Sequence, residues 1–151
     1  MNTFIDKISG HMRFSLFSLL LAFGVPIAAV AEKVDSLYGD LGGKEHIAVF
    51  ARDFVNIASS DSRIQKYFDG ANLPRLSQLL TEEFSSLAGG PVAYTGHSMK
   101  ETHQGMGLHD ADFNAVVEDL QLAMDHADVP FSVQNRLLAR LAPLEHEIVT
   151  K

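Results

Sequence analysis

Apolar residues recur at steps of three and four along most of the chain after residue 43, and glycine or proline separates each such stretch from the next. This spacing puts the apolar side chains on one face of an α-helix, which must be buried against other helices. The pattern predicts helices over residues 44–58, 73–87, 110–126 and 132–148. Asp61 or Ser62 is expected to cap a short turn that ends at Phe68.

The ends of these helices follow from their flanking residues. Asp110 and Ser132 are the expected N-caps of the last two helices. Pro143 lies within the final apolar pattern, where it is expected to kink the helix or end its first half. Only residues 91–94 look extended. The predicted fold class is therefore all-α.

The first 31 residues have the order of a secretory signal. A weakly basic start with Lys7 and Arg13 precedes an uncharged apolar run over 14–27, and an Ala29-Val30-Ala31 cleavage site follows. We expect a signal peptide over 1–31 and one domain over 32–151. The protein would then be exported, to the periplasm in a cell with two membranes and outside the cell otherwise. The alternative is an uncleaved segment that anchors the protein to the membrane.

Charge and cysteine content exclude several classes of function. The formal net charge is −7 and no basic stripe stands out, so we expect no nucleic-acid partner and no attraction to anionic membranes. The chain contains no cysteine, which excludes thiolate catalysis and cysteine-ligated metal or haem.

Most motif candidates fail on spacing. Asp110-x-Asp112-x-Asn114 begins like a calcium loop but lacks the glycine and the final glutamate that such a loop needs. His97, His103 and His109 are six residues apart, so one continuous helix could not present them to one metal. His103 lies on a short predicted helix that Gly105 would end. By its residue type and position alone it fits a surface or core histidine as well as a ligand.

Four segments resemble the truncated haemoglobins, and group I among them, over residues 34–149. Each corresponds to a family motif, and they occur in the family's order. They are Leu37-Tyr-Gly-Asp-Leu-Gly-Gly43, Asp61-Ser-Arg-Ile-Gln-Lys-Tyr-Phe68, Gly89-Gly-Pro91 with Tyr94-Thr-Gly96, and Met99-Lys-x-x-His103-x-Gly-x-Gly-Leu108.

The resemblance implies a globin-like two-over-two helical sandwich around one haem b. It assigns His103 as the iron ligand and packs Phe68 on the haem face. Leu76 and Leu80 would reach the distal side, together with Phe54 and Val55. Arg75 and Lys100 are the expected partners of the haem propionates. The other expected cofactor contacts are Phe84, Tyr94, Met99, Met106, Leu108, Phe113, Val116 and Leu141.

The distal side departs from the family pattern. Many group I members hold dioxygen with a tyrosine on the second helix and a polar residue on the next, where this chain has Val55, Leu76 and Leu80. Leu79 stands where some members carry an iron-binding histidine. The distal side is therefore expected to be apolar, although a shift of one residue would bring Gln78 inward.

The resemblance implies reversible binding of dioxygen, carbon monoxide and nitric oxide, for oxygen transport or gas scavenging, by a protein that is not itself an enzyme. An alternative is a nitric oxide dioxygenase or peroxidase-like enzyme that depends on a separate reductase as its redox partner. A third interpretation is a helical interaction domain without haem, in which His103 would be replaceable.

Overall fold

The computed structural model describes residues 36–150, and these form helices and connecting loops without any strand. The all-α prediction is confirmed. The predicted signal peptide lies outside the described residues. Among the residues described, no helix combines the length and apolar character needed to cross a membrane. The elements are α1 (Leu37–Asp40), α2 (Gly43–Ala58), η1 (Gln65–Phe68), α3 (Leu73–Leu87), α4 (Met99–His103), α5 (Asp110–His126), α6 (Phe131–Leu141), η2 (Ala142–Leu144) and α7 (Glu145–Ile148).

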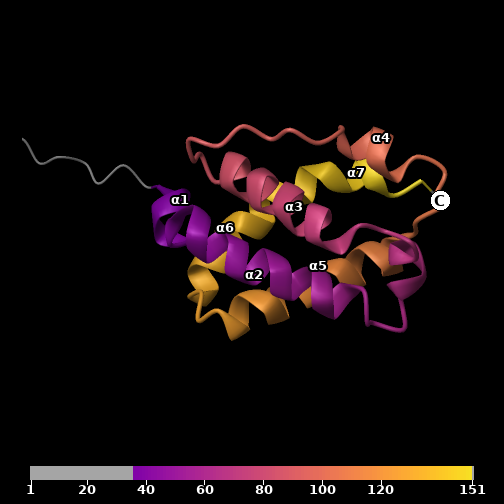
Figure 1. Cartoon of the computed structure of the whole chain (residues 1–151), viewed down its shortest axis with the longest axis horizontal. Helices are drawn as coiled ribbons and strands as arrows, with labels where there is room; N and C mark the ends of the chain where they lie inside the picture. The colour runs from indigo at the N-terminus through magenta and orange to yellow at the C-terminus, as the bar shows by residue number, and fades with distance from the viewer. Residues whose placement is uncertain (1–35, 151) are drawn as a thin grey trace, which may run out of the picture. The chain divides into compact units, whose positions relative to one another are not determined.

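The long helix α2 is the centre of the packing. It lies against α3 on one side and α5 on the other, while α6 contacts α1, α3 and α5 (Figure 1). The apolar face of α2 is fully buried at Ile47, Phe50 and Ala51. Phe50 stacks on Phe84 of α3, with ring centroids 5.9 Å apart. The burial of these large side chains supplies the main favourable free energy of folding.

Two helix starts differ from the prediction. Helix α5 begins at Asp110 with His109 as its N-cap residue, and the Asp112 carboxylate accepts a hydrogen bond from the His109 backbone N–H at 3.0 Å. Helix α6 begins at Phe131 with Pro130 as its N-cap, one turn position before Ser132. The Pro130 carbonyl accepts hydrogen bonds from Val133 and Gln134, so it already closes the first helical turn.

The effect of Pro143 was predicted correctly. Helix α6 ends at Leu141, a short 3-10 turn spans Ala142–Leu144, and α7 continues from Glu145. Proline lacks the N–H that an α-helix requires and clashes with the preceding turn. The interruption lets α7 lie against α4 (Figure 1).

Candidate functional site

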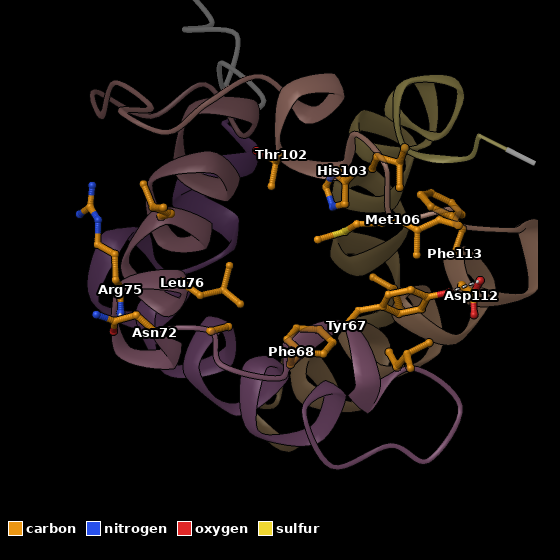
Figure 2. A pocket seen from close by; sticks show the side chains of 16 residues that line it. Tyr67, Phe68, Asn72, Arg75, Leu76, Thr102, His103, Met106, Asp112 and Phe113 are labelled. Carbon is orange, nitrogen blue, oxygen red and sulfur yellow. Dashed lines mark hydrogen bonds between the residues drawn. The ribbon is translucent and has the colours of Figure 1, made fainter.

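A cavity of about 400 Å³ lies between α4 on one side and α3 with η1 on the other. His103 and Met106 point into it from the first side, and Phe68 and Leu76 from the facing side (Figure 2). A second cavity of about 170 Å³ adjoins it further inside and shares His103, Phe68 and Leu76 among its lining residues. The two cavities together form a mainly apolar pocket, which we call the haem pocket.

His103 is held by the local sequence of α4. The Ser98 hydroxyl accepts a hydrogen bond from the Glu101 N–H at 3.3 Å, and the Glu101 carboxylate accepts one from the Ser98 N–H at 3.1 Å. This capping box fixes the start of the helix. The backbone turns left-handed at Gly105, where φ is +81°, soon after the helix has ended. These two signals place His103 in the last turn of α4.

The hydrogen bond of His103 leaves its other ring nitrogen for a ligand. Nδ1 lies 2.8 Å from the Met99 carbonyl oxygen. A carbonyl can only accept a hydrogen bond, so Nδ1 carries the proton and donates it. Nε2 of the neutral ring then keeps its lone pair. A fixed tautomer of this kind is what a metal-ligating histidine needs.

The structure brings most of the predicted pocket residues together. Two groups line the haem pocket, one in each cavity. The outer cavity is lined by Phe68, Arg75, Leu76, Met106, Leu108, Phe113 and Val116, and the inner cavity adds Phe54, Leu80, Phe84, Met99 and Leu141.

Three predicted contacts do not line either cavity. Val55 is buried in the helical core, while its neighbour Phe54 reaches the pocket, because adjacent helical residues point about 100° apart. Lys100 is exposed, one position beyond Met99 on α4. Tyr94 lies in the loop before α4 and is absent from the pocket lining.

The register of α3 is settled by its exposed face. Leu76, Leu79 and Leu80 line the haem pocket, whereas Gln78 is exposed and its side-chain oxygen accepts a hydrogen bond from the Arg75 guanidinium at 3.4 Å. The alternative with Gln78 turned inward is therefore wrong. Arg75 lies at the rim and its guanidinium points away from the opening (Figure 2).

Several lining residues were missed by the sequence analysis. Most are apolar or stand in the turn and C-terminal segments, where helical periodicity gives little guidance. Tyr67 is one of them, and its hydroxyl donates to the Asp112 carboxylate at 3.1 Å. Glu83 is another, and the steps of four and three from Leu76 through Leu80 to Glu83 were a signal that could have found it. The missed residues are Ile64, Tyr67, Ala71, Asn72, Thr102, Asp112, Ile148, Glu83, Val117, Leu120 and Leu144.

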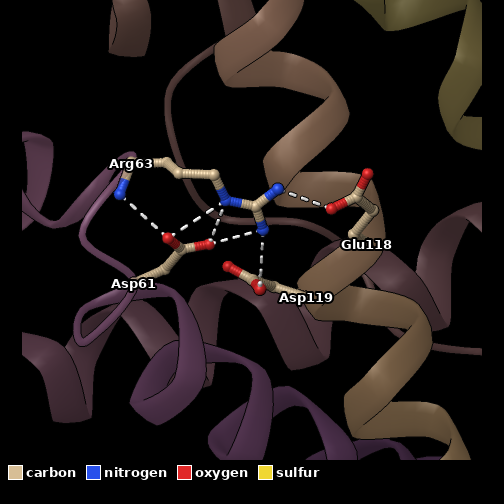
Figure 3. A network of polar contacts seen from close by, with 4 residues as sticks. All are labelled: Asp61, Arg63, Glu118 and Asp119. Carbon is tan, nitrogen blue, oxygen red and sulfur yellow. Dashed lines mark hydrogen bonds and ion pairs between the residues drawn. The ribbon is translucent and has the colours of Figure 1, made fainter.

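The segment that carries Tyr67 and Phe68 is tied to α5 by Arg63. Its guanidinium pairs with Asp61 at 2.6 Å, with Glu118, and with Asp119 at 3.8 Å (Figure 3). The hydrogen bonds from Arg63 hold the pKa of Asp61 below its ordinary value. Burial, assisted by the charge of Asp61, raises the pKa of Asp119. Arg63 thus offsets the cost of a buried carboxylate beside the floor of the pocket.

Replacing Arg63 with alanine is expected to lower the urea midpoint of unfolding, and to do so more at pH 7 than at acid pH. The stabilisation from Asp61 is present above its unfolded-state pKa and is lost as the pH falls through its lowered folded-state pKa. Asp119 without its cation would be most costly where it is ionised. Arg52→Ala is the control, since Arg52 forms no ion pair within the described residues. An equal loss at both pH values would contradict this account.

The chemistry of the pocket fits a haem group. Its walls are largely apolar, one imidazole presents a free Nε2, and polar side chains including Asn72 and Arg75 stand at the rim of the outer cavity. A porphyrin needs the same distribution, with an axial nitrogen ligand, apolar contact to the ring and polar groups near the propionates. The fold and this site define the class of protein, a haem-binding globin.

Comparison with known proteins identifies the family. The chain belongs to the bacterial-like globins, whose family model matches residues 36–150. It is 36% identical over 115 residues to the group 1 truncated hemoglobin GlbN of Mycolicibacterium paratuberculosis, covering 76% of this chain and 85% of the relative. The truncated hemoglobin of Tetrahymena pyriformis matches with a TM-score of 0.74 at 25% identity, over 77% of this chain and 99% of that one.

These relationships confirm the resemblance to group I truncated haemoglobins, the two-over-two globin fold and haem as the cofactor. A 2/2 hemoglobin from Synechococcus has the same fold, with a TM-score of 0.70 at 23% identity over 77% of this chain and 99% of that one. The family thus accounts for nearly all of the described residues.

Proposed function

We propose that this protein reversibly binds diatomic gases, namely dioxygen, carbon monoxide and nitric oxide, at a haem held by His103. The observation that carries the proposal is the hydrogen bond from His103 Nδ1 to the Met99 carbonyl, at the edge of a mainly apolar pocket. It presents a neutral imidazole with its lone pair available.

Each part of the pocket has a role in this function. Bound haem supplies an iron atom that takes a gas molecule as its ligand. His103 holds the group by one axial bond, and its hydrogen bond to Met99 fixes the orientation of the ring. Phe68 packs against the flat face of the ring. The apolar walls exclude water and so disfavour loss of charge-separated dioxygen as superoxide.

The α3 side of the pocket favours rapid release of dioxygen. Leu76 and Leu80 lie there and have no hydrogen-bond donor. Bound dioxygen takes on negative charge, and a hydrogen bond to a charged group is worth about 1.5–3 kcal/mol. Its loss corresponds to roughly one to two orders of magnitude in affinity. Carbon monoxide and nitric oxide are less polarised and lose less.

The test is the spectrum and ligand kinetics of the purified, reduced protein. We expect a five-coordinate ferrous spectrum that shifts sharply with carbon monoxide. In Leu80→Gln, an amide donor enters the pocket, so dioxygen release is expected to slow by about tenfold or more while carbon monoxide release changes less. Gln78→Leu is the matched control on the exposed face of α3 and is expected to leave both rates unchanged. A six-coordinate ferrous spectrum in the wild type would overturn this view of the pocket.

We place the protein among gas-binding proteins rather than self-sufficient enzymes. Nitric oxide dioxygenation consumes electrons that must restore ferrous iron after each cycle. The described residues are accounted for by the globin domain, so such electrons would come from a separate redox partner. Steady consumption of nitric oxide by the purified protein, without an added reductase, would contradict this placement.

We also propose that the protein works outside the cytoplasm. Support comes from the order of basic, apolar and small residues before Ala31. The test is cell fractionation followed by N-terminal sequencing of the recovered protein, with Glu32 as the expected first residue. A protein that retains its first 31 residues in the cytosolic fraction would contradict export.

A further inference from the structure

Glu83 of α3 is a carboxyl group in the inner cavity of the haem pocket. It is 9% exposed and forms no hydrogen bond or ion pair with any described residue. Buried ionisable groups are usually paired, because removal of a charge from water is costly. Its position inside a ligand cavity therefore calls for a functional explanation.

The neighbouring Glu82 shows how differently two consecutive glutamates are used. Its carboxylate accepts hydrogen bonds from the backbone N–H of Thr95 at 3.0 Å and from the Thr95 hydroxyl at 2.6 Å. These bonds lower the pKa of Glu82. Glu82 thus fastens the loop before α4 to the outside of α3, whereas Glu83 turns inward and has no such partner.

The surroundings of Glu83 are almost free of other charges. Glu83 and His103 are the titratable residues that line the inner cavity, and α2, α5, α6, η2 and α7 contribute apolar side chains to it. Tyr94 faces Glu83 from the loop, since burial and then the charge of Glu83 raise the pKa of this tyrosine. Burial alone raises the pKa of Glu83. The neutral acid is thus favoured more than in water, and the carboxylate is a stronger base.

We propose that Glu83 is the proton acceptor of the haem pocket, and that it enables the pocket to capture small weak acids HX, such as hydrazoic acid and hydrogen cyanide, as their anions. This proposal rests on the gas-binding function proposed above, because it uses the same haem-loaded pocket. The transfer is balanced: HX and the Glu83 carboxylate become X⁻, held in the pocket, and the Glu83 carboxylic acid. The H–X bond breaks, and an O–H bond forms on Glu83.

Conservation of charge is the physical basis of this assignment. A neutral acid HX can cross the apolar walls, whereas its anion would have to leave water at a high cost. The pocket holds one negative charge before the transfer and one afterwards, so no charge moves between solvent and interior. Without Glu83 the proton would have to escape through the same apolar walls. Proton transfer to a positioned group typically accelerates a reaction by about 10²–10⁴-fold.

The experiment measures azide association with the ferric, haem-loaded protein by stopped flow between pH 5 and 8. Glu83→Gln keeps the size of the side chain but removes its basicity, and is expected to slow azide association about 10²-fold. Glu82→Gln is the matched control, with the same change one residue away and outside both cavities, and is expected to behave as the wild type. Carbon monoxide binds without a proton, so its association with the reduced Glu83→Gln variant is expected to match the wild type.

Infrared difference spectroscopy provides a second readout that does not depend on rates. Azide binding to the wild type is expected to produce the carbonyl stretch of one protonated carboxyl group, which is shifted by ¹³C-labelled glutamate and absent in Glu83→Gln. If that variant does not fold, the labelled wild type alone decides the question. The proposal is overturned by an unchanged rate of azide association in Glu83→Gln or by the absence of a carboxyl band in the wild type. Failure of the wild type to bind carbon monoxide would instead reject the gas-binding function itself.

Discussion

Replacing His103 with alanine is expected to remove the axial bond to haem and with it most of the stability that haem confers. A ligand that binds only the folded protein stabilises it by about 2.7 kcal/mol at a concentration one hundred times its dissociation constant. The wild type should therefore unfold at higher urea with haem than without it. In His103→Ala the two midpoints should nearly coincide, and the absorption spectrum of the reduced form should lose its five-coordinate histidine character.

His97→Ala is the matched control for this prediction. His97 is exposed in the loop before α4 and lines neither cavity. The variant should retain the haem spectrum and its stabilisation. Added imidazole should restore an axial bond in His103→Ala, because the deleted ring leaves space beside the pocket. Full haem stabilisation in His103→Ala without imidazole would show that another residue binds the iron.

Replacing Phe84 with alanine is expected to lower the free energy of unfolding by about 3–5 kcal/mol, the usual cost of truncating a buried phenylalanine. Phe84 is 2% exposed, stacks on Phe50 and contacts Phe54. It also lines the inner cavity, so its truncation would enlarge that cavity as well as weaken the core. Chemical denaturation of the haem-free protein would measure the loss without a contribution from haem.

Phe131→Ala provides the comparison for Phe84. Phe131 is the first residue of α6 and is 67% exposed, so its truncation removes little buried area. Its effect is expected to stay within about 0.5 kcal/mol, as for other surface substitutions. A small loss in Phe84→Ala, comparable with that in Phe131→Ala, would indicate that the two-helix stack of Phe50 and Phe84 contributes little to stability.

Local sequence accounts for much of the fold. The pattern over 73–87 predicted α3 with the bounds that the structure has, and α2 begins only one residue before its predicted start. The break at Pro143 was also predictable, because it depends on a missing N–H and not on any distant residue. The placement of Phe68, Leu76 and His103 around one pocket came from the resemblance to the truncated haemoglobins, since periodicity alone does not show which apolar faces meet.

The predictions that failed depend on neighbours that are distant in sequence. Val55 is as apolar as Phe54, and only the packing of α2 between α3 and α5 decides which of them reaches the cavity. The positions of Lys100 and Tyr94 depend on how the loop before α4 folds over α3. That loop has no helical period from which a direction could be inferred.

Glu83 separates most clearly what each level of structure determined. The sequence fixed its angular position on α3, seven residues after Leu76 and three after Leu80, and so placed it on their face. A search for apolar stripes passes over it because the residue is polar. Its burial arises only when α5, η2 and α7 pack around the inner cavity. Helical periodicity is set by local backbone geometry, whereas the environment of a side chain is set by the whole tertiary fold.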